Sequence, residues 1–189
     1  FKQSQLMNAL ARVGQIEPER VLAPLVAERW GYRRRARLGV KYVPKKGGTL
    51  VGFRERGAPF IAELSRCEVL VPHVGDRLLD LARMIDRLSI RERVPQIEVA
   101  AADNATALVF RVLDTPTADD LAILAAFGHE HGFQIHLQPG NEDTIAPIDE
   151  AAAALYYDLP AFDARLFFLP NDFVQIHAGI NRAMVNAAL

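Results

Sequence analysis

The chain has 189 residues, of which half are hydrophobic and 24% are charged. This composition is typical of a folded globular domain and excludes a disordered tail or a collagen-like fibre. A disulfide-rich module is excluded by the single cysteine, which fits a reducing cytoplasm, and the apolar runs are too short for a membrane span.

The formal net charge of −1 conceals an uneven distribution along the chain. Residues 1–93 carry 19 Lys and Arg against 10 Asp and Glu, whereas residues 94–189 carry 3 against 13. The two halves therefore have net charges of +9 and −10. Such an asymmetry predicts a basic surface that binds a polyanion.

Hydrophobic periodicity predicts an amphipathic helix over residues 2–13, which Gly14 ends. A shorter helical or irregular stretch follows at 18–28. Two strand patterns, at 32–42 and 49–54, flank a basic Pro-Lys-Lys-Gly-Gly turn and predict a β-hairpin.

The rest of the chain alternates between hairpins and helices, which predicts an α+β fold with a mostly antiparallel sheet built from hairpins with interspersed helices. The expected elements are a strand at 60–64, a helix at 76–88, a hairpin of 96–102 and 105–113, a helix from the N-cap Thr117 to Gly132, a strand at 133–137, a hairpin of 155–159 and 164–169, and a terminal helix at 176–189.

The first hairpin is the strongest candidate for a binding surface. Residues 32–56 hold nine Lys and Arg against one acid, and strand alternation places the basic side chains opposite the apolar ones. Cations along one strand neutralise phosphates, and interleaved rings stack on unpaired bases. A solvated edge hairpin kept soluble by its charges is the plainer alternative. The candidate RNA-binding residues are Arg33, Arg35, Arg37, Lys41, Phe53 and Arg54.

Catalytic and metal sites are not evident from the residues alone. Cys67 has no second cysteine to share a metal, so it is a buried small hydrophobe or one ligand of a site completed elsewhere. His129 and His131 point apart on a helix and suit its C-terminal end better than a metal. No carboxylate pair and no glycine-rich phosphate loop is present, so no catalytic residue is assigned.

Four motifs occur in a characteristic order: Trp-Gly-Tyr-Arg-Arg-Arg-Ala-Arg-Leu at 30–38, Gly-Phe-Arg at 52–54, Cys67 followed by Pro72, and Asp-Phe-Val-Gln at 172–175. Together they resemble the central part of the RNA uracil-5 methyltransferases, in particular the 23S ribosomal RNA class that contains an iron–sulfur cluster. The resemblance covers essentially the whole chain.

The resemblance implies a central domain without the TRAM barrel and without the Rossmann-like S-adenosylmethionine domain of the full-length protein. Cys67 is implied as the fourth ligand of a [4Fe-4S] cluster, and Gln175 as a contact of S-adenosylmethionine. His177 stands where the family has Asn and receives no role. The catalytic residues are implied to lie outside this chain, which we expect to be inactive alone. The implied parts are a helical segment at 1–29, an RNA-recognition domain at 30–170 and a linker helix at 171–189.

The implied parent enzyme forms 5-methyluridine in large-subunit ribosomal RNA, in the cytoplasm. Two other classes of function remain open: a stand-alone RNA-binding module without enzyme activity, and a small-molecule-binding regulatory domain. RNA binding requires an affinity that falls steeply with salt, whereas the regulatory domain predicts no such dependence.

Overall fold

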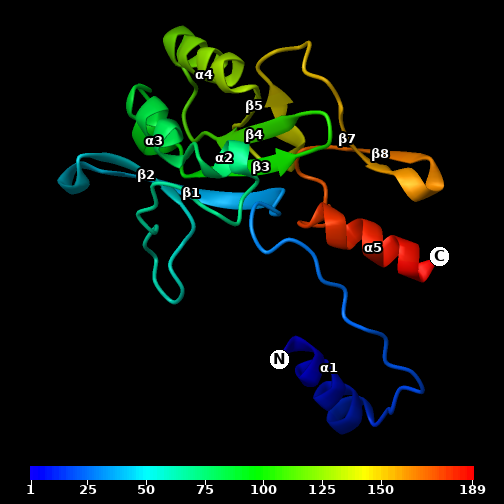
Figure 1. The fold of residues 1–189 in the computed structure, drawn as a ribbon. Helices are drawn as coiled ribbons and strands as arrows, with labels where there is room; N and C mark the ends of the chain where they lie inside the picture. Colours follow the sequence, from blue (N-terminus) through cyan, green and yellow to red (C-terminus); the bar gives the residue numbers. More distant parts are fainter.

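A computed structural model describes all residues, 1–189. Its centre is a six-stranded sheet in the order β2-β1-β3-β4-β5-β6, with a separate two-stranded hairpin, β7-β8 (Figure 1). The strands are β1 (Arg35–Val43), β2 (Gly48–Gly52), β3 (Gln96–Ala101), β4 (Thr106–Arg111), β5 (Phe133–Gln138), β6 (Ala146–Pro147), β7 (Leu155–Leu159) and β8 (Ala164–Phe168).

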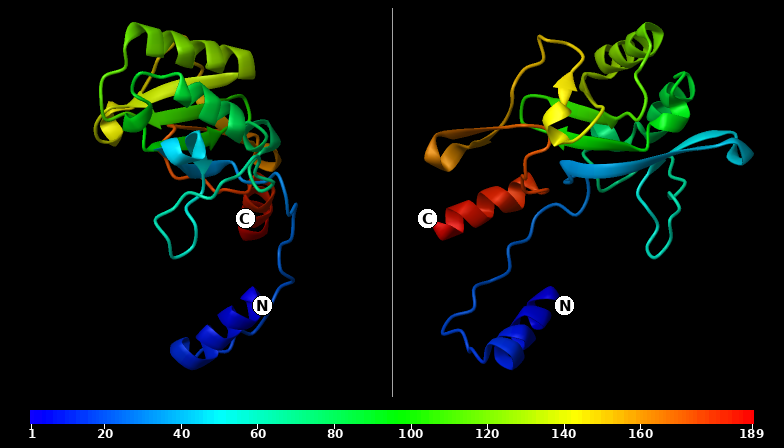
Figure 2. Two further views of the ribbon diagram at one scale, coloured as in Figure 1. Left: turned by 90° about the vertical axis from the view of Figure 1, so that its left-hand side faces the viewer. Right: turned by 180° about the vertical axis from the view of Figure 1, so that it is seen from behind.

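Helices α2 (Pro72–Gly75), α3 (Leu78–Asp86) and α4 (Ala118–His131) lie on one face of the sheet, where α3 packs on β2 and α4 packs on β5 (Figures 1 and 2). None of the helices combines the length and the apolar run that crossing a bilayer requires. The helices are α1 (Lys2–Ala9), α2 (Pro72–Gly75), α3 (Leu78–Asp86), α4 (Ala118–His131) and α5 (Ala178–Ala188).

The core forms between these helices and the apolar side of each strand. Leu38, Ile97 and Phe110 face the helices and are fully buried. Each such side chain contributes about 1.5–3 kcal/mol by leaving water, so this helical face accounts for much of the fold's stability. The opposite side, which we call the polar face, carries Arg37, Glu98 and His136, since residues paired across a ladder share a face.

Helix α4 begins and ends as its sequence predicts. Thr117 and Asp120 form a reciprocal capping box, and Gly132 closes the helix in the left-handed conformation at φ 71°. Close packing of α4 on β5 depends on Gly128, because a Cβ there would lie 2.7 Å from the Phe133 carbonyl oxygen. The predicted helix at 117–132 is confirmed.

The predicted fold class is wrong, because the sheet is mixed rather than a succession of antiparallel hairpins. β4 and β5 are parallel, with Thr106 opposite Phe133 and Arg111 opposite Gln138. The cause is α4, which returns the chain along the sheet so that β5 starts at the same end as β4; a parallel pair requires such a crossover.

The three predicted hairpins are present, as β1-β2, β3-β4 and β7-β8. The strand expected at 60–64 does not form and leaves a single bridge between Arg54 and Ile61. The first helix ends earlier than expected, at Ala9, and continues as a π-helical turn over Leu10–Gly14. None of its residues is buried, and α1 lies apart from the sheet (Figure 2).

Candidate functional site

The alternation predicted for the first basic strand is confirmed. In β1, Ala36, Leu38 and Val40 are buried, while Arg37 and Lys41 are exposed on the polar face. Arg33 precedes the strand, which begins at Arg35. The basic residues therefore line one side of the sheet, but their environments differ.

Arginines 35 and 37 are engaged within the chain. The Arg37 Nη2 lies 2.9 Å from the Glu98 Oε1, and the Arg35 Nη2 lies 3.9 Å from Oε2 of the same carboxylate. Arg35 also donates a hydrogen bond to the carbonyl oxygen of Pro170. Burial lowers the pKa of the Arg35 guanidinium from its ordinary value, although Glu98 opposes the shift. Glu98 thus neutralises part of the basic strand.

Arg33 and Phe53 form a second internal contact. The Arg33 guanidinium lies 5.7 Å from the centroid of the Phe53 ring, and its Nε donates to the Arg35 carbonyl oxygen at 3.1 Å. Phe53 is half-buried and packs against the core. This contact is a cation–π pair that occupies both residues, so neither is fully available to a ligand.

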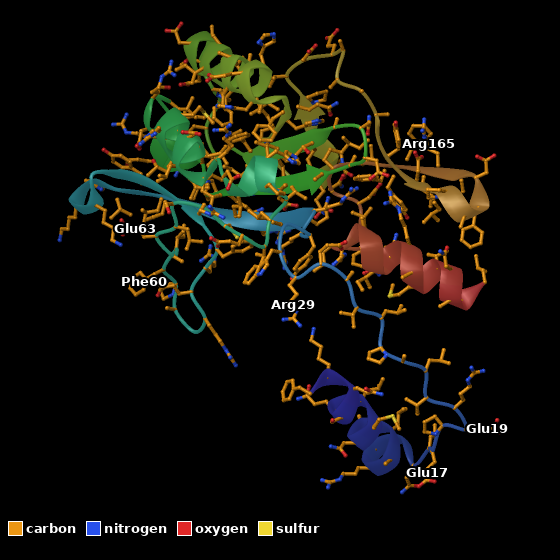
Figure 3. The ribbon with its side chains drawn as sticks, viewed as in Figure 1. Glu17, Glu19, Arg29, Phe60, Glu63 and Arg165 are labelled. Carbon is orange, nitrogen blue, oxygen red and sulfur yellow. The ribbon has the colours of Figure 1, made fainter.

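Lys41 and Arg54 remain exposed and line a groove of about 810 Å³ between the β1-β2 hairpin and the loop that follows it. Lys46 also lines this groove, and its ammonium pairs with Glu63 at 2.8 Å on the open surface, where such pairs are weak. The apolar wall includes Phe60, a residue that is 67% exposed (Figure 3). We call these four residues, Lys41, Lys46, Arg54 and Phe60, the basic groove.

Phe60 was missed as a site residue, because its sequence pattern favoured a strand. The available signal was Gly57 and Pro59 just before it, since glycine and proline are typical of turns and loops. The predicted site residues therefore separate into an engaged group and an open groove.

Cys67 is half-buried, and its amide donates to the Gly75 carbonyl oxygen of α2 at 3.0 Å. Gly75 lies so close that a Cβ there would be 2.3 Å from the Cys67 carbonyl oxygen. No three His, Cys, Asp or Glu side chains converge on a common point in the structure. One thiolate does not make a [4Fe-4S] site, so the residues of this chain do not hold such a cluster by themselves.

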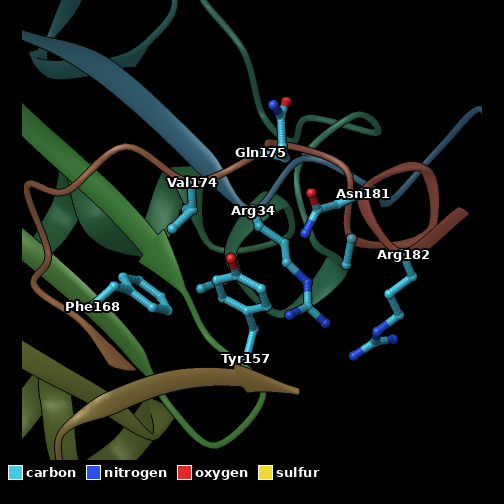
Figure 4. Close-up of a pocket in the computed structure, with 9 residues that line it drawn as sticks. Arg34, Tyr157, Phe168, Val174, Gln175, Asn181 and Arg182 are labelled. Atoms are coloured by element: carbon cyan, nitrogen blue, oxygen red, sulfur yellow. The ribbon is translucent and has the colours of Figure 1, made fainter. Parts of the chain in front are cut away.

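Gln175 is exposed and borders a small cavity beside Arg34, Tyr157 and Asn181 (Figure 4). The cavity measures about 20 Å³, which is room for a water molecule and not for a nucleoside. The Gln175 side chain points away from the Arg34 guanidinium and from Tyr157 (Figure 4). This chain does not enclose S-adenosylmethionine, and Gln175 is open to a contact from outside.

His131 and His177, which lie near the ends of helices, make contacts within the chain. His177 caps α5, since its Nδ1 accepts from the Ile180 amide at 3.3 Å, and its ring stacks on Tyr32 at 4.7 Å. The ring centroids of His131 and Phe127 lie 4.5 Å apart in a T-shaped arrangement. These contacts account for the positions of His131 and His177 within the fold.

No protein-family model matches the chain. The 23S rRNA (uracil(1939)-C(5))-methyltransferase RlmD of Alkalilimnicola ehrlichii is 56% identical to it over 190 residues, which covers 100% of this chain and 43% of that protein. The protein of the same name from Methylococcus capsulatus is 44% identical, with the same two coverages.

Over its whole length, the chain is similar to part of these 23S rRNA uracil-5 methyltransferases. The family predicted from the four motifs is thereby confirmed. The chain spans less than half the length of these curated relatives.

Among solved structures, the tRNA (uracil-54, C5)-methyltransferase of Pyrococcus abyssi in complex with S-adenosyl-L-homocysteine has a similar fold, with a TM-score of 0.63 and 16% identity. The match covers 96% of this chain and 45% of that one. At this identity the likeness concerns the fold alone. The mixed sheet of this chain thus occurs within the chain of a solved methyltransferase. This match also corrects the predicted fold class, which set the domain apart from the methyltransferase fold.

Proposed function

We propose that this chain is the RNA-recognition part of an S-adenosylmethionine-dependent methyltransferase that forms 5-methyluridine in large-subunit ribosomal RNA. The curated relatives support the reaction and the class of RNA by their names. The observation that carries RNA recognition is the basic groove, where exposed cations border an exposed aromatic ring. This combination suits single-stranded RNA, whose phosphates pair with cations and whose bases stack on rings.

The proposed role of the chain is to hold RNA while the target base is exposed. A uracil inside a stacked strand must leave the stack before its C5 is accessible, which costs a few kcal/mol. Lys41, Lys46 and Arg54 offset that cost by neutralising neighbouring phosphates, and Phe60 stacks on an unpaired base. Arg33, Arg35, Arg37 and Phe53 contribute to the same surface from their internally paired positions.

The cofactor contacts belong to the same proposal. S-adenosylmethionine supplies an activated methyl group. The exposed side chain of Gln175, at the border of the small cavity described above, contacts this cofactor. Cys67 supplies one thiolate of a [4Fe-4S] cluster whose other ligands are not among these 189 residues. The domain division at 1–29, 30–170 and 171–189 is proposed with it, and no residue of the chain is assigned to the covalent steps of methyl transfer.

RNA binding by the basic groove is tested by fluorescence anisotropy with a single-stranded oligonucleotide of ribosomal RNA sequence. The double variant Lys41→Glu with Arg54→Glu is expected to weaken binding at least about tenfold at low salt, and to flatten the slope of log affinity against log salt by about 0.7 for each lost phosphate contact. The matched control is Lys2→Glu with Arg12→Glu, on the exposed N-terminal helical segment. Equal losses in the two double variants would contradict the groove assignment.

The assignment of catalysis to other parts of the enzyme has its own test. The 189-residue chain, mixed with RNA and S-adenosylmethionine labelled in its methyl group, is expected to transfer no label to RNA. Label transferred above the level of a protein-free control would show that the reactive groups lie within these residues.

A further inference from the structure

The polar face of the sheet contains a second hollow. Strands β3 and β4 separate it from β1, which borders the basic groove. The hollow lies over β5, where Gln134 and His136 point to the same side. Across the ladders, His136 pairs with Val109, Val109 with Glu98, and Glu98 with Arg37. One row of side chains therefore crosses the face from β5 to β1.

His136 is 93% buried, yet neither of its ring nitrogens has a hydrogen-bond partner. The Oε1 of Gln134 is buried without a partner as well, while its Nε2 donates to the Ala153 carbonyl oxygen at 2.9 Å. Buried polar atoms are almost always paired, and leaving three unpaired in one place costs free energy. Such a cluster is expected where a ligand supplies the missing partners.

The hollow has a volume of about 310 Å³. Its walls include two prolines and two aromatic rings, and no lysine or arginine is among its lining residues. The one carboxylate, that of Asp172, is engaged by the Leu169 amide at 2.7 Å. These surroundings fit a flat, uncharged ring and not a phosphate. The wall residues are Pro147, Phe167, Phe168 and Pro170.

We propose that this hollow binds an unstacked nucleobase of the RNA, with His136 and Gln134 reading its hydrogen-bonding edge. A neutral imidazole offers one donor and one acceptor, and the Gln134 Oε1 offers a further acceptor. This set complements a base edge on which an N–H lies beside an acceptor atom. Burial lowers the pKa of His136, which keeps the imidazole neutral at pH 7.

The hollow adjoins the basic strand through one hydrogen bond. Pro170, in its wall, accepts a hydrogen bond from the Arg35 guanidinium, so a nucleotide bound in the hollow would lie near the basic residue that begins β1. Access to the shielded nitrogens requires the covering segment around Ala153 to move. That segment is held through few hydrogen bonds, among them Gln134 to Ala153 and Asn104 to Ala154, both at 2.9 Å.

This inference rests on the proposed RNA binding, and its test separates the two. His136→Phe keeps a ring of similar size but removes both nitrogens, and His129→Phe on the exposed end of α4 is the matched control. We expect His136→Phe to lower oligonucleotide affinity about tenfold with an unchanged salt slope, because a base contact and no charge is lost. His129→Phe is expected to bind as the unchanged chain does.

Nuclear magnetic resonance gives a direct readout on the same chain. The ring 15N resonances of His136 are expected to shift on addition of at least one of uridine, cytidine, adenosine or guanosine, each used as the free nucleoside. Unmoved resonances together with unchanged affinity of His136→Phe would overturn the proposal. If the groove variant Lys41→Glu with Arg54→Glu weakens binding in that case, RNA recognition by the groove stands and only the base site fails. Thermal unfolding of each variant verifies that the fold is intact.

Discussion

Arg37 and Glu98 face each other across the β1-β3 ladder, with 2.9 Å between the guanidinium and the carboxylate. Arg35 approaches the same carboxylate from the next position on the polar face. One acid, contributed by a strand about sixty residues away in sequence, therefore sets how much of the positive charge of β1 is available to a polyanion.

Replacing Glu98 is expected to strengthen RNA binding. Glu98→Gln keeps the size of the side chain and removes its charge, so Arg35 and Arg37 lose their shared counter-ion. We expect an affinity gain of severalfold at low salt and a salt slope steeper by about 0.7 for each phosphate newly contacted. Anisotropy titrations at several salt concentrations measure both. Glu130→Gln, on an exposed position of α4, controls for net charge, and an equal gain there would refute a local effect.

Asp120 is expected to be the most sensitive carboxylate for stability. It is 1% exposed and accepts from the amides and hydroxyls of both Ser89 and Thr117. Asp120→Ala leaves these donors without their acceptor and is expected to cost about 3 kcal/mol. This corresponds to a fall in melting temperature of about 6–12 °C for a chain of this size. The neighbouring exposed Asp119→Ala should change the melting temperature far less, as calorimetry can verify.

A side chain at Gly75 is expected to displace Cys67. The Cβ of Gly75→Ala would meet the Cys67 carbonyl oxygen at 2.3 Å, so α2 and the segment before it must separate. Overpacking of this kind costs about 1–3 kcal/mol. Chemical denaturation measures the loss, and labelling of the Cys67 thiol should become faster. Gly14→Ala, where the nearest atom is 3.8 Å away, is the control and should leave both measurements unchanged.

Asp103, which holds Arg182 of α5, is expected to make the stability of the fold depend on pH. Its carboxylate accepts from Arg34, from Arg182 at 2.8 Å and from the Asp158 amide at 3.0 Å. Burial raises the pKa of Asp103, but these hydrogen bonds outweigh burial and hold the pKa below its ordinary value. A lowered carboxyl pKa contributes stability above the unfolded-state value near 4, and that stability is lost as the pH falls through the folded-state pKa.

The corresponding measurement compares the unfolding free energy of the unchanged chain and of Asp103→Asn between pH 7 and pH 3. The difference is expected to be largest at neutral pH and to shrink below about pH 4. Asp76→Asn, at an exposed position, serves as the control. A difference that stays constant over this range would mean that the charge of Asp103 does not contribute.

Local patterns were sufficient to predict most elements of the fold. The hairpins follow from alternation and turn residues, and α4 follows from Thr117 at its start and Gly132 at its end. The direction of β5 was not predicted, because it depends on where α4 packs, and that is a tertiary property. Residues 60–64 have the composition of a strand but find only one bridge, between Arg54 and Ile61.

The candidate site was predicted less completely, for a related reason. Alternation correctly gave the exposed sides of Arg37 and Lys41, since it is a property of the strand itself. The sheet brings together the residues that pair Arg37 with Glu98 and those that bury the ring nitrogens of His136. A single sequence holds no local signal for either, so the division between engaged and available cations required the structure.

The alternation in β1 also constrains how this segment can vary. A change of one residue in its length would turn Arg35 and Arg37 toward the helices and expose Ala36 and Leu38, because neighbouring side chains point to opposite faces. Substitutions alter the charge of one face and leave the other packed, whereas a one-residue deletion exchanges the two faces. Within β1, related chains are therefore expected to differ by replacement and to keep the same length.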